Sequence, residues 1–545
     1  MNETIDSQPL PAYQVGQRIE IDRSRGTIRF LGLVPPTTGE WIGVEWDDKE
    51  RGKHSGEHQG TQYFTCQFPG TGSFTRPSKK IETGTSLVEI LKERYIDLDK
   101  GNGAPIYLGN NVEVEVVGFE LIKERQRNLH LMTAVGLANT NVATAAGYEE
   151  TQETCPNIED LDLSSTLVST WQTIADISLP LKKLKILRLS RNRFMPLTLQ
   201  PDFSESFRGL RCLSMNRVFL KWEQIELLEP SMPNLEILQF GFNQLTNLGS
   251  VENAMEEDSG VLPKVKGFEN LQMMHLEGNL FEDWSQIQRL SKLPKLTLLD
   301  VSENKFRQVG PPELSGFEKL DTIRINDNLL DNWSDVVQLG LYGSLRAVWI
   351  GNNPVMRLSE GQSGDTNVID ARTATIARMS QIDSLNGSDI AKKERIDAEL
   401  YYLKHVVLST EGMEALAVNQ LHPRFEQLCQ IHGRPDISAE SRKATSEILK
   451  DRLIAITLVH KTRPSGPPKN SIQKNVLGTM TIKNLKNLVQ RTLKVPVRRQ
   501  ELYFLVNDPD YADKMVTVRM EDDLRQISFY EVMDNQEVTV LDKGT

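Results

Sequence analysis

The chain has 545 residues, of which 39% are hydrophobic and 25% are charged, and its formal net charge is -11 at pH 7. This length is too great for one hydrophobic core and predicts about three folded domains. The negative charge argues against nucleic-acid binding by the whole chain, and the sequence has neither a secretory signal nor an apolar run of about 18 residues that would span a membrane. Its four cysteines are scattered singly, which indicates a reducing compartment and predicts a cytoplasmic protein.

Residues 1–85 are expected to form a small all-β barrel. Between Tyr13 and Thr83, short apolar runs are interrupted by glycines, as in GTIRFLG, GEWIGVEWD and GTGSFTRP. Runs of this kind, rich in aromatic and β-branched residues, predict short strands joined by tight turns. So many glycines in about 70 residues indicate turns with positive φ, or backbone that another chain approaches closely.

Residues 86–130 are interpreted as a linker and N-terminal cap, and residues 131–410 as leucine-rich repeats with a helical C-terminal cap. The pattern LxxLxLxxN recurs about every 25 residues, and each copy predicts one strand of an α/β solenoid whose leucines point inward. Clear copies begin at Ile158, Leu184, Leu210, Leu235, Leu271, Leu296, Leu320 and Leu345. A weaker copy at Met132 is expected to open the array, and the acidic stretch VENAMEEDSG is expected to loop out of the longest step.

Residues that alternate with the buried leucines are expected to face the concave side of the solenoid. A surface that offers arginine and aromatic side chains suits a folded acidic partner. The predicted positions are Asp162, Arg188, Arg191, Arg217, Phe242, His275, Arg324 and Trp349. The tryptophans that recur in the other half of the repeats are interpreted as packing residues, at Trp171, Trp222, Trp284 and Trp333.

The remaining chain is expected to contain helices and then a second α/β domain. The stretch SDIAKKERIDAELYYLKHVV has helical spacing, and Ser388 is a candidate N-cap. Residues 411–450 are interpreted as a helical linker. In residues 451–545 the predicted order is strand, strand, helix, strand, short helix, strand, which is typical of the β-grasp fold of ubiquitin-like domains.

The N-terminal module resembles the CAP-Gly family, whose GKNDG motif lines a groove for acidic C-terminal tails. Here the motif is GKHSG at residues 52–56, so that His54 and Ser55 replace Asn and Asp. A CAP-Gly module followed by leucine-rich repeats and a ubiquitin-like domain is similar to the architecture of the tubulin-folding cofactor E family. The strings RGKHSG, LHPRFEQLC and GTMTIKNLKNLVQRTLKVPV extend this resemblance over nearly the whole chain.

The resemblance implies a chaperone that is associated with the cytoskeleton and binds α-tubulin through its acidic tail and body. Its implied partners are α-tubulin, the α/β-tubulin heterodimer and tubulin-folding cofactors B, C and D, with the proteasome as a further candidate for the ubiquitin-like domain. A tail that ends in Glu-Glu-Tyr needs cations, N–H donors and an apolar slot. The residues expected to provide them are Trp41, Trp46, Gly52, Lys53, His54, Ser55, Gly56, Phe64, Phe74 and Arg76. The alternative that Trp46 and Phe74 only build the core of the module stays open.

No enzymatic activity, cofactor or metal site is predicted. The sequence lacks a P-loop and a GxSxG elbow, and His422, Cys429 and His432 are one ligand short of a structural zinc site. Two other functions remain open at this point. The chain could be a microtubule-associated CAP-Gly scaffold, or an adaptor that carries cargo to the ubiquitin pathway and the proteasome.

Overall fold

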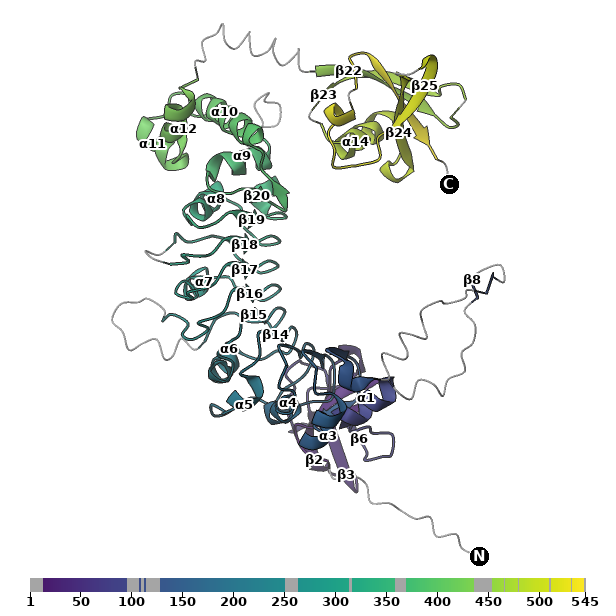
Figure 1. The fold of residues 1–545 in the computed structure, drawn as a ribbon, viewed down its shortest axis with the longest axis vertical. Helices are drawn as coiled ribbons and strands as arrows, with labels where there is room; N and C mark the ends of the chain where they lie inside the picture. The colour runs from purple at the N-terminus through teal and green to yellow at the C-terminus, as the bar shows by residue number, and fades with distance from the viewer. Residues whose placement is uncertain are drawn as a thin grey trace, which may run out of the picture. The chain divides into compact units, whose positions relative to one another are not determined.

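The structure is a computed structural model that describes residues 13–95, 107–108, 112–113, 128–249, 263–312, 316–357, 369–435, 453–464, 466–478, 480–508, 511–530 and 532–543. The chain divides into two compact units, Met1–His432 and Gly433–Thr545. Figure 1 labels their helices and strands. None of the helices in the described ranges combines the length and apolar character needed to cross a membrane. The VENAMEEDSG insertion and residues 436–450 of the 411–450 linker lie outside the described residues.

The first unit begins with a four-stranded antiparallel sheet in the order β1-β2-β3-β6. Ile19, Ile28, Ile42 and Val44 pack beneath it as a small core. The described sheet is open, because its edge strands β1 and β6 do not pair, whereas a barrel was predicted. The strands are β1 (Arg18–Ile21), β2 (Ser24–Leu33), β3 (Glu40–Trp46) and β6 (Gly72–Thr75), with η1 (Lys49–Arg51), β4 (Glu57–His58) and β5 (Thr61–Gln62) between β3 and β6.

The chain then passes directly into the repeat array. Strand β7 (Thr85–Ser86) pairs in parallel with β11 (Val142–Thr144), and helix α1 (Leu87–Tyr95) adds Leu87 and Leu91 to the large core of the repeats. Two further short strands, β8 (Tyr107–Leu108) and β9 (Val112–Glu113), pair with each other. The segment after the glycine-rich module is therefore partly built into the array.

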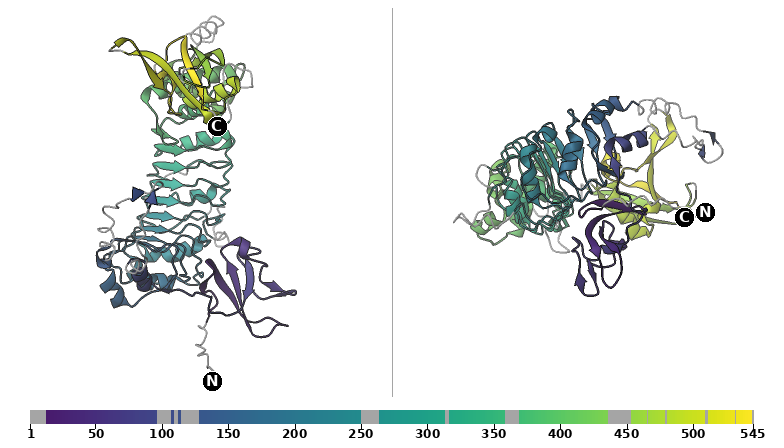
Figure 2. Two further views of the ribbon diagram at one scale, coloured as in Figure 1. Left: turned by 90° about the vertical axis from the view of Figure 1, so that its right-hand side faces the viewer. Right: turned by 90° about the horizontal axis from the view of Figure 1, so that it is seen from below.

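The repeats form an 11-stranded sheet in which consecutive strands are neighbours. The pairing is parallel and in register from β10 to β20, and the last strand, β21, is antiparallel. Figure 2 shows this stack of short strands. The weaker copy at Met132 supplies β10, which is the edge strand, as predicted. The strands are β10 (Ala134–Gly136), β12 (Asp160–Asp162), β13 (Ile186–Arg188), β14 (Cys212–Ser214), β15 (Ile237–Gln239), β16 (Met273–His275), β17 (Leu298–Asp300), β18 (Thr322–Arg324), β19 (Ala347–Trp349), β20 (Ser384–Leu385) and β21 (Ser388–Asp389).

Short helices follow most of the strands and cover the side of the repeats opposite the exposed face of the sheet, although no described helix lies between β15 and β16 or between β17 and β18. Trp171, Trp222 and Trp284 are at most 3% exposed and pack into the core, which confirms their interpretation as packing residues. The helical segments are η3 (Leu129–Leu131), α3 (Tyr148–Thr154), α4 (Trp171–Ser178), α5 (Ser204–Phe207), α6 (Trp222–Leu228), η4 (Glu229–Ser231), α7 (Ser285–Gln288), α8 (Trp333–Gly340), η6 (Pro354–Arg357) and α9 (Ala371–Arg378).

A helical cap follows the last repeat. It consists of α10 (Lys392–Ser409), α11 (Ala415–Leu421) and α12 (Phe425–His432). The prediction that Ser388 caps α10 is wrong, because the helix begins at Lys392 and its N-cap is Ala391. Ser388 is instead paired with Leu385 in a two-strand turn, which keeps the chain extended up to the helix.

The second unit is a five-stranded sheet in the order β23-β22-β26-β24-β25 with one long helix. Leu485 and Val489 of that helix pack on Leu458 and Val538 of the central strands. The unit contains β22 (Leu453–Lys461), β23 (Asn470–Leu477), α14 (Ile482–Leu493), η7 (Val497–Arg499), β24 (Gln500–Asp508), β25 (Tyr511–Arg519), η8 (Ile527–Tyr530) and β26 (Gln536–Asp542). The predicted order of elements is present, with β25 as an additional strand.

Candidate functional site

The GKHSG loop is anchored to strand β6 by backbone hydrogen bonds. The N–H groups of Lys53 and His54 both donate to the carbonyl of Gly72, at 2.8 and 3.1 Å, and Gly72 N–H donates to the carbonyl of His54 at 2.7 Å. A Cβ atom added at Gly52 would lie 1.9 Å from the carbonyl oxygen of Gly70. Only glycine allows this approach, so the loop is fixed to the sheet.

Gly56 closes the loop in a conformation that favours glycine, with φ of +99°, and its added Cβ would lie 1.9 Å from the carbonyl oxygen of Phe64. Its N–H donates to Nδ1 of His54 at 2.9 Å, and the Ser55 hydroxyl accepts the N–H of Gly70 at 2.9 Å. The loop was expected to offer free N–H donors to a ligand. The N–H groups of Lys53, His54 and Gly56 are instead bonded within the module and are not available to a ligand.

Beside the loop, aromatic rings gather around Phe74. Phe74 lies opposite Gly43 in the pairing of β3 and β6, and a Cβ atom at Gly43 would lie 2.4 Å from the ring of Phe64. Gly43 therefore makes room for the cluster. The rings whose centroids lie within 6.3 Å of the Phe74 ring are His54, Phe64, Tyr63, Phe30, Trp41 and His58.

Trp46 does not belong to this cluster. It is 3% exposed, packs with Ile19 and Ile28 in the core, and donates its indole N–H to the Ser73 hydroxyl at 2.7 Å. The prediction that Trp46 lines the slot is therefore wrong, because it lies on the core face of β3. Phe74 is half-buried and has the rings around it, so its place in the site stays a prediction.

Phe30, Tyr63 and His58 are cluster residues that the sequence reasoning left out of the site. The face of Phe30 could not be predicted because the register shifts within β2. Ile28 pairs with Val44, but Phe30 pairs with Gly43. This bulge turns Phe30 away from the core, whereas strict alternation would place it beside Ile28. Tyr63 follows the GKHSG motif closely in sequence, and that proximity was the available signal.

Two cations flank the aromatic cluster. Lys53 is exposed, and Arg76 lies over the ring of Trp41 at 3.9 Å while it donates to the carbonyl of Glu40 at 3.1 Å. Burial lowers the pKa of His54, and its Nδ1 accepts the Gly56 N–H, so the ring is neutral with its proton on Nε2. Positive charge, an imidazole N–H and aromatic faces together suit a peptide that carries carboxylates and a ring.

The module is seated on the first repeats through a polar and aromatic seam. Arg193 lies 3.8 Å from the Asp47 carboxylate and stacks over Phe219 at 4.5 Å. Phe219 in turn contacts Phe68 of the module, with ring centroids 4.8 Å apart, and its carbonyl accepts the Gln67 side-chain N–H at 3.0 Å. Burial lowers the pKa of the Arg193 guanidinium and Asp47 opposes this effect, so the ion pair keeps the buried charge compensated.

The exposed face of the repeat sheet carries five of the eight predicted concave residues. Asp162, Arg188, His275, Arg324 and Trp349 are each the last residue of a strand, and they alternate with fully buried central residues. Arg188 pairs with Asp160, and Arg324 lies over the Trp349 ring at 5.3 Å. The other three, Arg191, Arg217 and Phe242, lie three residues beyond their strands, in turns with φ of 61°, 61° and 57°.

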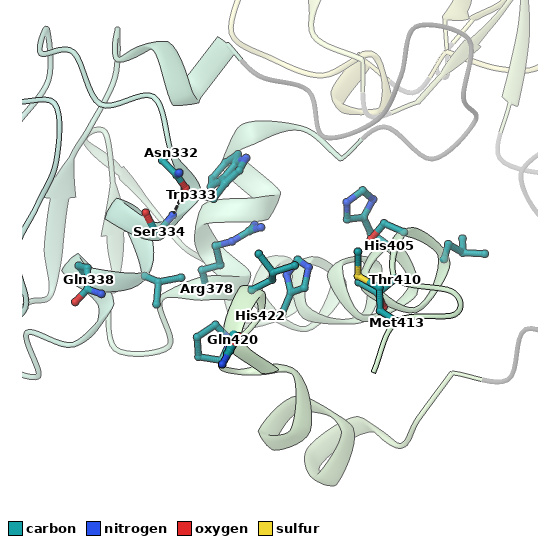
Figure 3. Close-up of a pocket in the computed structure, with 15 residues that line it drawn as sticks. Asn332, Trp333, Ser334, Gln338, Arg378, His405, Thr410, Met413, Gln420 and His422 are labelled. Carbon is teal, nitrogen blue, oxygen red and sulfur yellow. Dashed lines mark hydrogen bonds between the residues drawn. The ribbon is translucent and has the colours of Figure 1, made fainter. Parts of the chain in front are cut away.

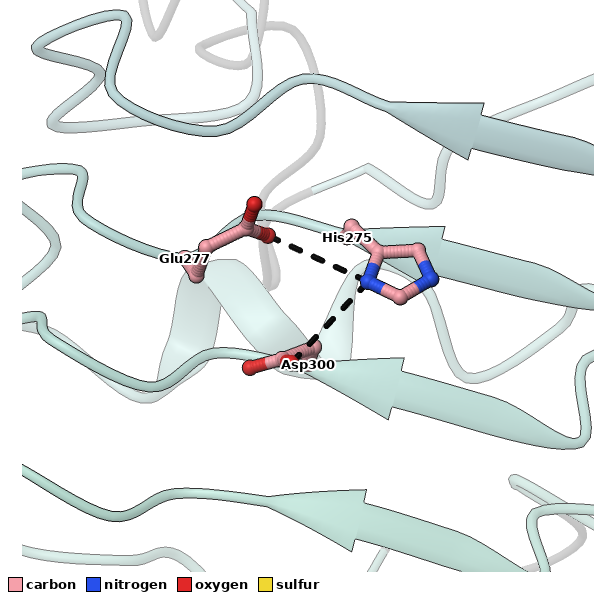
Figure 4. A group of neighbouring side chains, drawn as sticks. All are labelled: His275, Glu277 and Asp300. Carbon is pink, nitrogen blue, oxygen red and sulfur yellow. Dashed lines mark ion pairs between the residues drawn. The ribbon is translucent and has the colours of Figure 1, made fainter. Parts of the chain in front are cut away.

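His275, Glu277 and Asp300 form a polar group on this face (Figure 4). His275 Nδ1 lies 4.0 Å from Glu277 and 3.9 Å from Asp300, and among the described residues this is the only group with spacing that could hold a metal ion. Burial lowers the pKa of His275 and raises that of Glu277. Asp300, however, already pairs with Arg324 at 3.4 Å and accepts from Ser302, so a cation occupies its carboxylate and no metal is assigned.

A cavity of about 630 Å³ lies among the ends of α8, α10 and α11 (Figure 3). Trp333, Arg378, His405, Met413 and His422 are among its lining residues. Its volume is in the range of small-molecule sites. The sequence contained no signal for this cavity, because its walls come from helices that meet only in the folded chain. Its mixed lining does not select one class of ligand.

Residues 15–80 match the family model of the CAP-Gly domain. Tubulin-specific chaperone E of Bos taurus is 32% identical over 537 residues, which cover 95% of this chain and 96% of that protein. The chain belongs to the tubulin-specific chaperone E family.

A plant protein also resembles this chain over most of its length. Tubulin-folding cofactor E of Arabidopsis thaliana is 28% identical over 508 residues, which cover 90% of this chain and 92% of that protein. The solved C-terminal ubiquitin-like domain of mouse tubulin-specific chaperone E is 23% identical and covers 17% of this chain and 90% of that structure, with a TM-score of 0.15. The sequence match to the family extends well beyond the CAP-Gly domain and over nearly the whole chain.

Proposed function

We propose that this chain is a tubulin-folding chaperone that binds α-tubulin through its acidic C-terminal tail and its folded body. It acts with tubulin-folding cofactors B, C and D in the assembly and dissociation of the α/β-tubulin heterodimer. It catalyses no reaction and works by binding alone, and any nucleotide hydrolysis occurs in tubulin.

The observation that carries this proposal is the site around Phe74. Lys53, Arg76 and the His54 Nε2–H are side-chain partners for carboxylates, and the rings around Phe74 are partners for a terminal aromatic residue. A tail that ends in Glu-Glu-Tyr has both chemistries. Membership in a family whose members are named tubulin-specific chaperones supports tubulin as the protein that carries this tail.

The repeat sheet is the proposed seat for the body of α-tubulin. Its exposed face has arginine and aromatic side chains, including Arg188, Arg324 and Trp349, which are enriched in binding hot spots. A tail held in the CAP-Gly groove raises the effective concentration of the attached body at this face. The ubiquitin-like unit, residues 451–545, is proposed as a docking module for other proteins, with the proteasome as a candidate.

The first test mixes the full chain with native tubulin dimer, with and without its acidic tails, and measures complex formation by size. We expect a complex with intact tubulin and a clearly weaker one after the tails are removed. A chain that binds only polymer and leaves it intact would favour the microtubule scaffold. A chain that ignores tubulin and binds proteasome through residues 451–545 would favour the adaptor.

Replacement of Lys53 by alanine tests the groove directly. We expect Lys53→Ala to weaken binding of an α-tubulin tail peptide several-fold, because an exposed ion pair contributes up to about 1 kcal/mol. The loss should be larger at low ionic strength, since the screening length grows from about 10 Å at 0.1 M salt to about 30 Å at 0.01 M. Titration calorimetry with Lys80→Ala as control compares an exposed lysine of the same module that lies outside the loop. Equal affinities for the two variants would remove Lys53 from the site.

A further inference from the structure

Two arginines at the start of the array occupy equivalent positions in successive repeats. Arg191 and Arg217 each lie three residues beyond a strand. Each is in a turn of its own and has a φ of 61°, in the left-handed region. Their backbones are bonded in series, because Arg191 N–H donates to the Asn216 carbonyl at 2.8 Å and Arg217 N–H donates to the Gly241 carbonyl at 3.1 Å. Adjacent strands lie about 5 Å apart, so the two arginine side chains are attached to backbone segments of neighbouring repeats.

Both arginines are exposed, and neither has an ion-pair partner in the part of the chain that the structure describes. The nearby cations differ in this respect, since Arg188 pairs with Asp160 and Arg211 pairs with Glu236. The Arg217 guanidinium lies over the ring of Phe242 at 4.4 Å, which restricts its motion and leaves its N–H groups available. These are two uncompensated positive charges on a chain whose net charge is negative.

A continuous series of contacts joins this pair to the CAP-Gly module. Arg193 donates to the Arg217 carbonyl at 2.8 Å and stacks on Phe219 at 4.5 Å. Phe219 contacts Phe68 at 4.8 Å, and the Lys49 ammonium lies 5.0 Å from the centre of the Phe68 ring. Lys49 belongs to η1, three residues before the GKHSG loop.

The carboxylate within the seam is paired with arginines. Asp47 is its carboxylate, and Asp47 is bound by Arg18 at 2.7 Å and approached by Arg193 at 3.8 Å. Lys49, Arg217 and Arg191 are therefore joined by a series of contacts in which the Asp47 carboxylate is already paired, while exposed Asp48 and Glu50 adjoin Lys49 in the sequence. This series leads from the loop that flanks the aromatic cluster onto the repeat array.

We propose that Lys49, Arg217 and Arg191 form a cationic track that binds the acidic segment preceding the last residues of the partner's tail. This inference rests on the proposed function, because it assumes that the CAP-Gly groove holds the tail end. An extended peptide advances at most about 3.6 Å per residue, so a groove that holds a few terminal residues leaves the preceding glutamates outside it. Arginines bind such carboxylates with paired N–H donors, and the track directs the tail toward the array.

The test uses the full chain and two peptides with the same Glu-Glu-Tyr end, one of three residues and one of about 12 residues with glutamates before that end. We expect wild type to bind the long peptide at least about fivefold more tightly at low salt, with the advantage shrinking as salt rises. The double variant Arg191→Gln with Arg217→Gln should lose most of this advantage and bind the short peptide unchanged. Lys49→Gln, a change outside the repeats, should lose part of it.

The controls separate the track from general electrostatics and from the groove. Arg307→Gln with Arg357→Gln removes the same charge from exposed arginines of later repeats and should leave both affinities unchanged. A long peptide with glutamine in place of the glutamates before the shared end should bind wild type like the short one. If wild type binds both acidic peptides equally, or if the track variant and its control behave alike, the track is refuted. If the track variant weakens the short peptide as much as the long one, the arginines act through the groove, which also refutes the track. If neither peptide binds wild type, the proposed function itself fails.

Discussion

His54 illustrates how single side chains set the chemistry of the candidate site around Phe74. Its ring lies 5.1 Å from that of Phe74, and its Nδ1 accepts the Gly56 N–H. Burial lowers its pKa from 6.5; Glu57 opposes this shift, whereas His58 and Lys53 reinforce it. A proton added to Nδ1 would also break the bond to Gly56. The neutral form is therefore the one that the folded module favours.

This preference predicts a pH dependence of stability. In the unfolded chain the residue takes up a proton as the pH falls below about 6.5, whereas in the folded module it stays neutral to lower pH. The contribution of His54 to the free energy of unfolding is therefore complete above pH 6.5 and is lost as the pH falls from there toward the folded pKa. His54→Asn does not titrate and offers an oxygen in place of Nδ1.

We expect the stability difference between wild type and His54→Asn to shift in favour of the variant between about pH 7.5 and 5.5, measured by urea unfolding at a series of pH values. The other histidines, apart from His58, which interacts with His54, are common to both proteins and cancel in the difference. A difference that stays constant over this range would contradict the neutral assignment.

Residue-level sequence reasoning predicted a candidate site but left out residues that the structure places beside it. The GKHSG spacing located Lys53 and His54, because a motif lists residues that are close in sequence. It could not separate Trp46 from Phe74, since the face of a strand depends on register. The bulge in β2 reversed the face of Phe30, and no residue type marks that bulge.

At the scale of elements, the repeats are held together by buried asparagines that bond across successive turns. Asn279 is 2% exposed; its oxygen accepts the N–H groups of Asn243 and Leu245, and its amide donates to the carbonyls of Phe240 and Leu276. The asparagines that are buried in this way are Asn192, Asn243, Asn279, Asn304, Asn328 and Asn353. Each supplies partners for backbone groups that the short strands leave unpaired.

Asn279→Ala should therefore destabilise the first unit by several kcal/mol, because each buried backbone group left without a partner costs about 1 to 3 kcal/mol. Asn247→Ala is the matched control, since among the described residues the Asn247 amide donates only to the neighbouring Thr246 hydroxyl, in an exposed bond. Urea unfolding of the full chain should show a lower midpoint for Asn279→Ala and an almost unchanged one for Asn247→Ala. Equal midpoints would mean that the array tolerates the loss of this bridge.

Elements with a strong period were predictable, and elements without one were not. The LxxLxLxxN spacing placed every strand from β12 to β19, because each central leucine or its equivalent must be buried. The edge strand β25 was missed, since its sequence YADKMVTVR mixes charged and apolar residues, as edge strands do. Ser388 has the chemistry of an N-cap, but its tertiary pairing with Leu385 overrides that local preference.

At the scale of the whole molecule, the proposed tubulin site lies within the first unit. The CAP-Gly cluster, the seam and the repeat face are all in Met1–His432. The large core of the repeats extends from Leu87 to Ala398, whereas the core of the second unit extends from Ile456 to Val540. Each unit thus has its own buried apolar residues, as independently folding domains do.

This separation predicts the effect of ending the chain after Arg434. The shortened protein should fold, bind the acidic tail peptide as tightly as the full chain, and keep the unfolding midpoint of the first unit, because no residue of its cores is removed. The fragment 453–543 should unfold cooperatively by itself, since Ile456, Leu485 and Val538 belong to one core. The denaturant unfolding curve of the full chain should then equal the sum of the unfolding curves of the two fragments. A lower midpoint or a weaker tail affinity in the shortened protein would show instead that the second unit supports the first, and the site would have to be assigned to both units together.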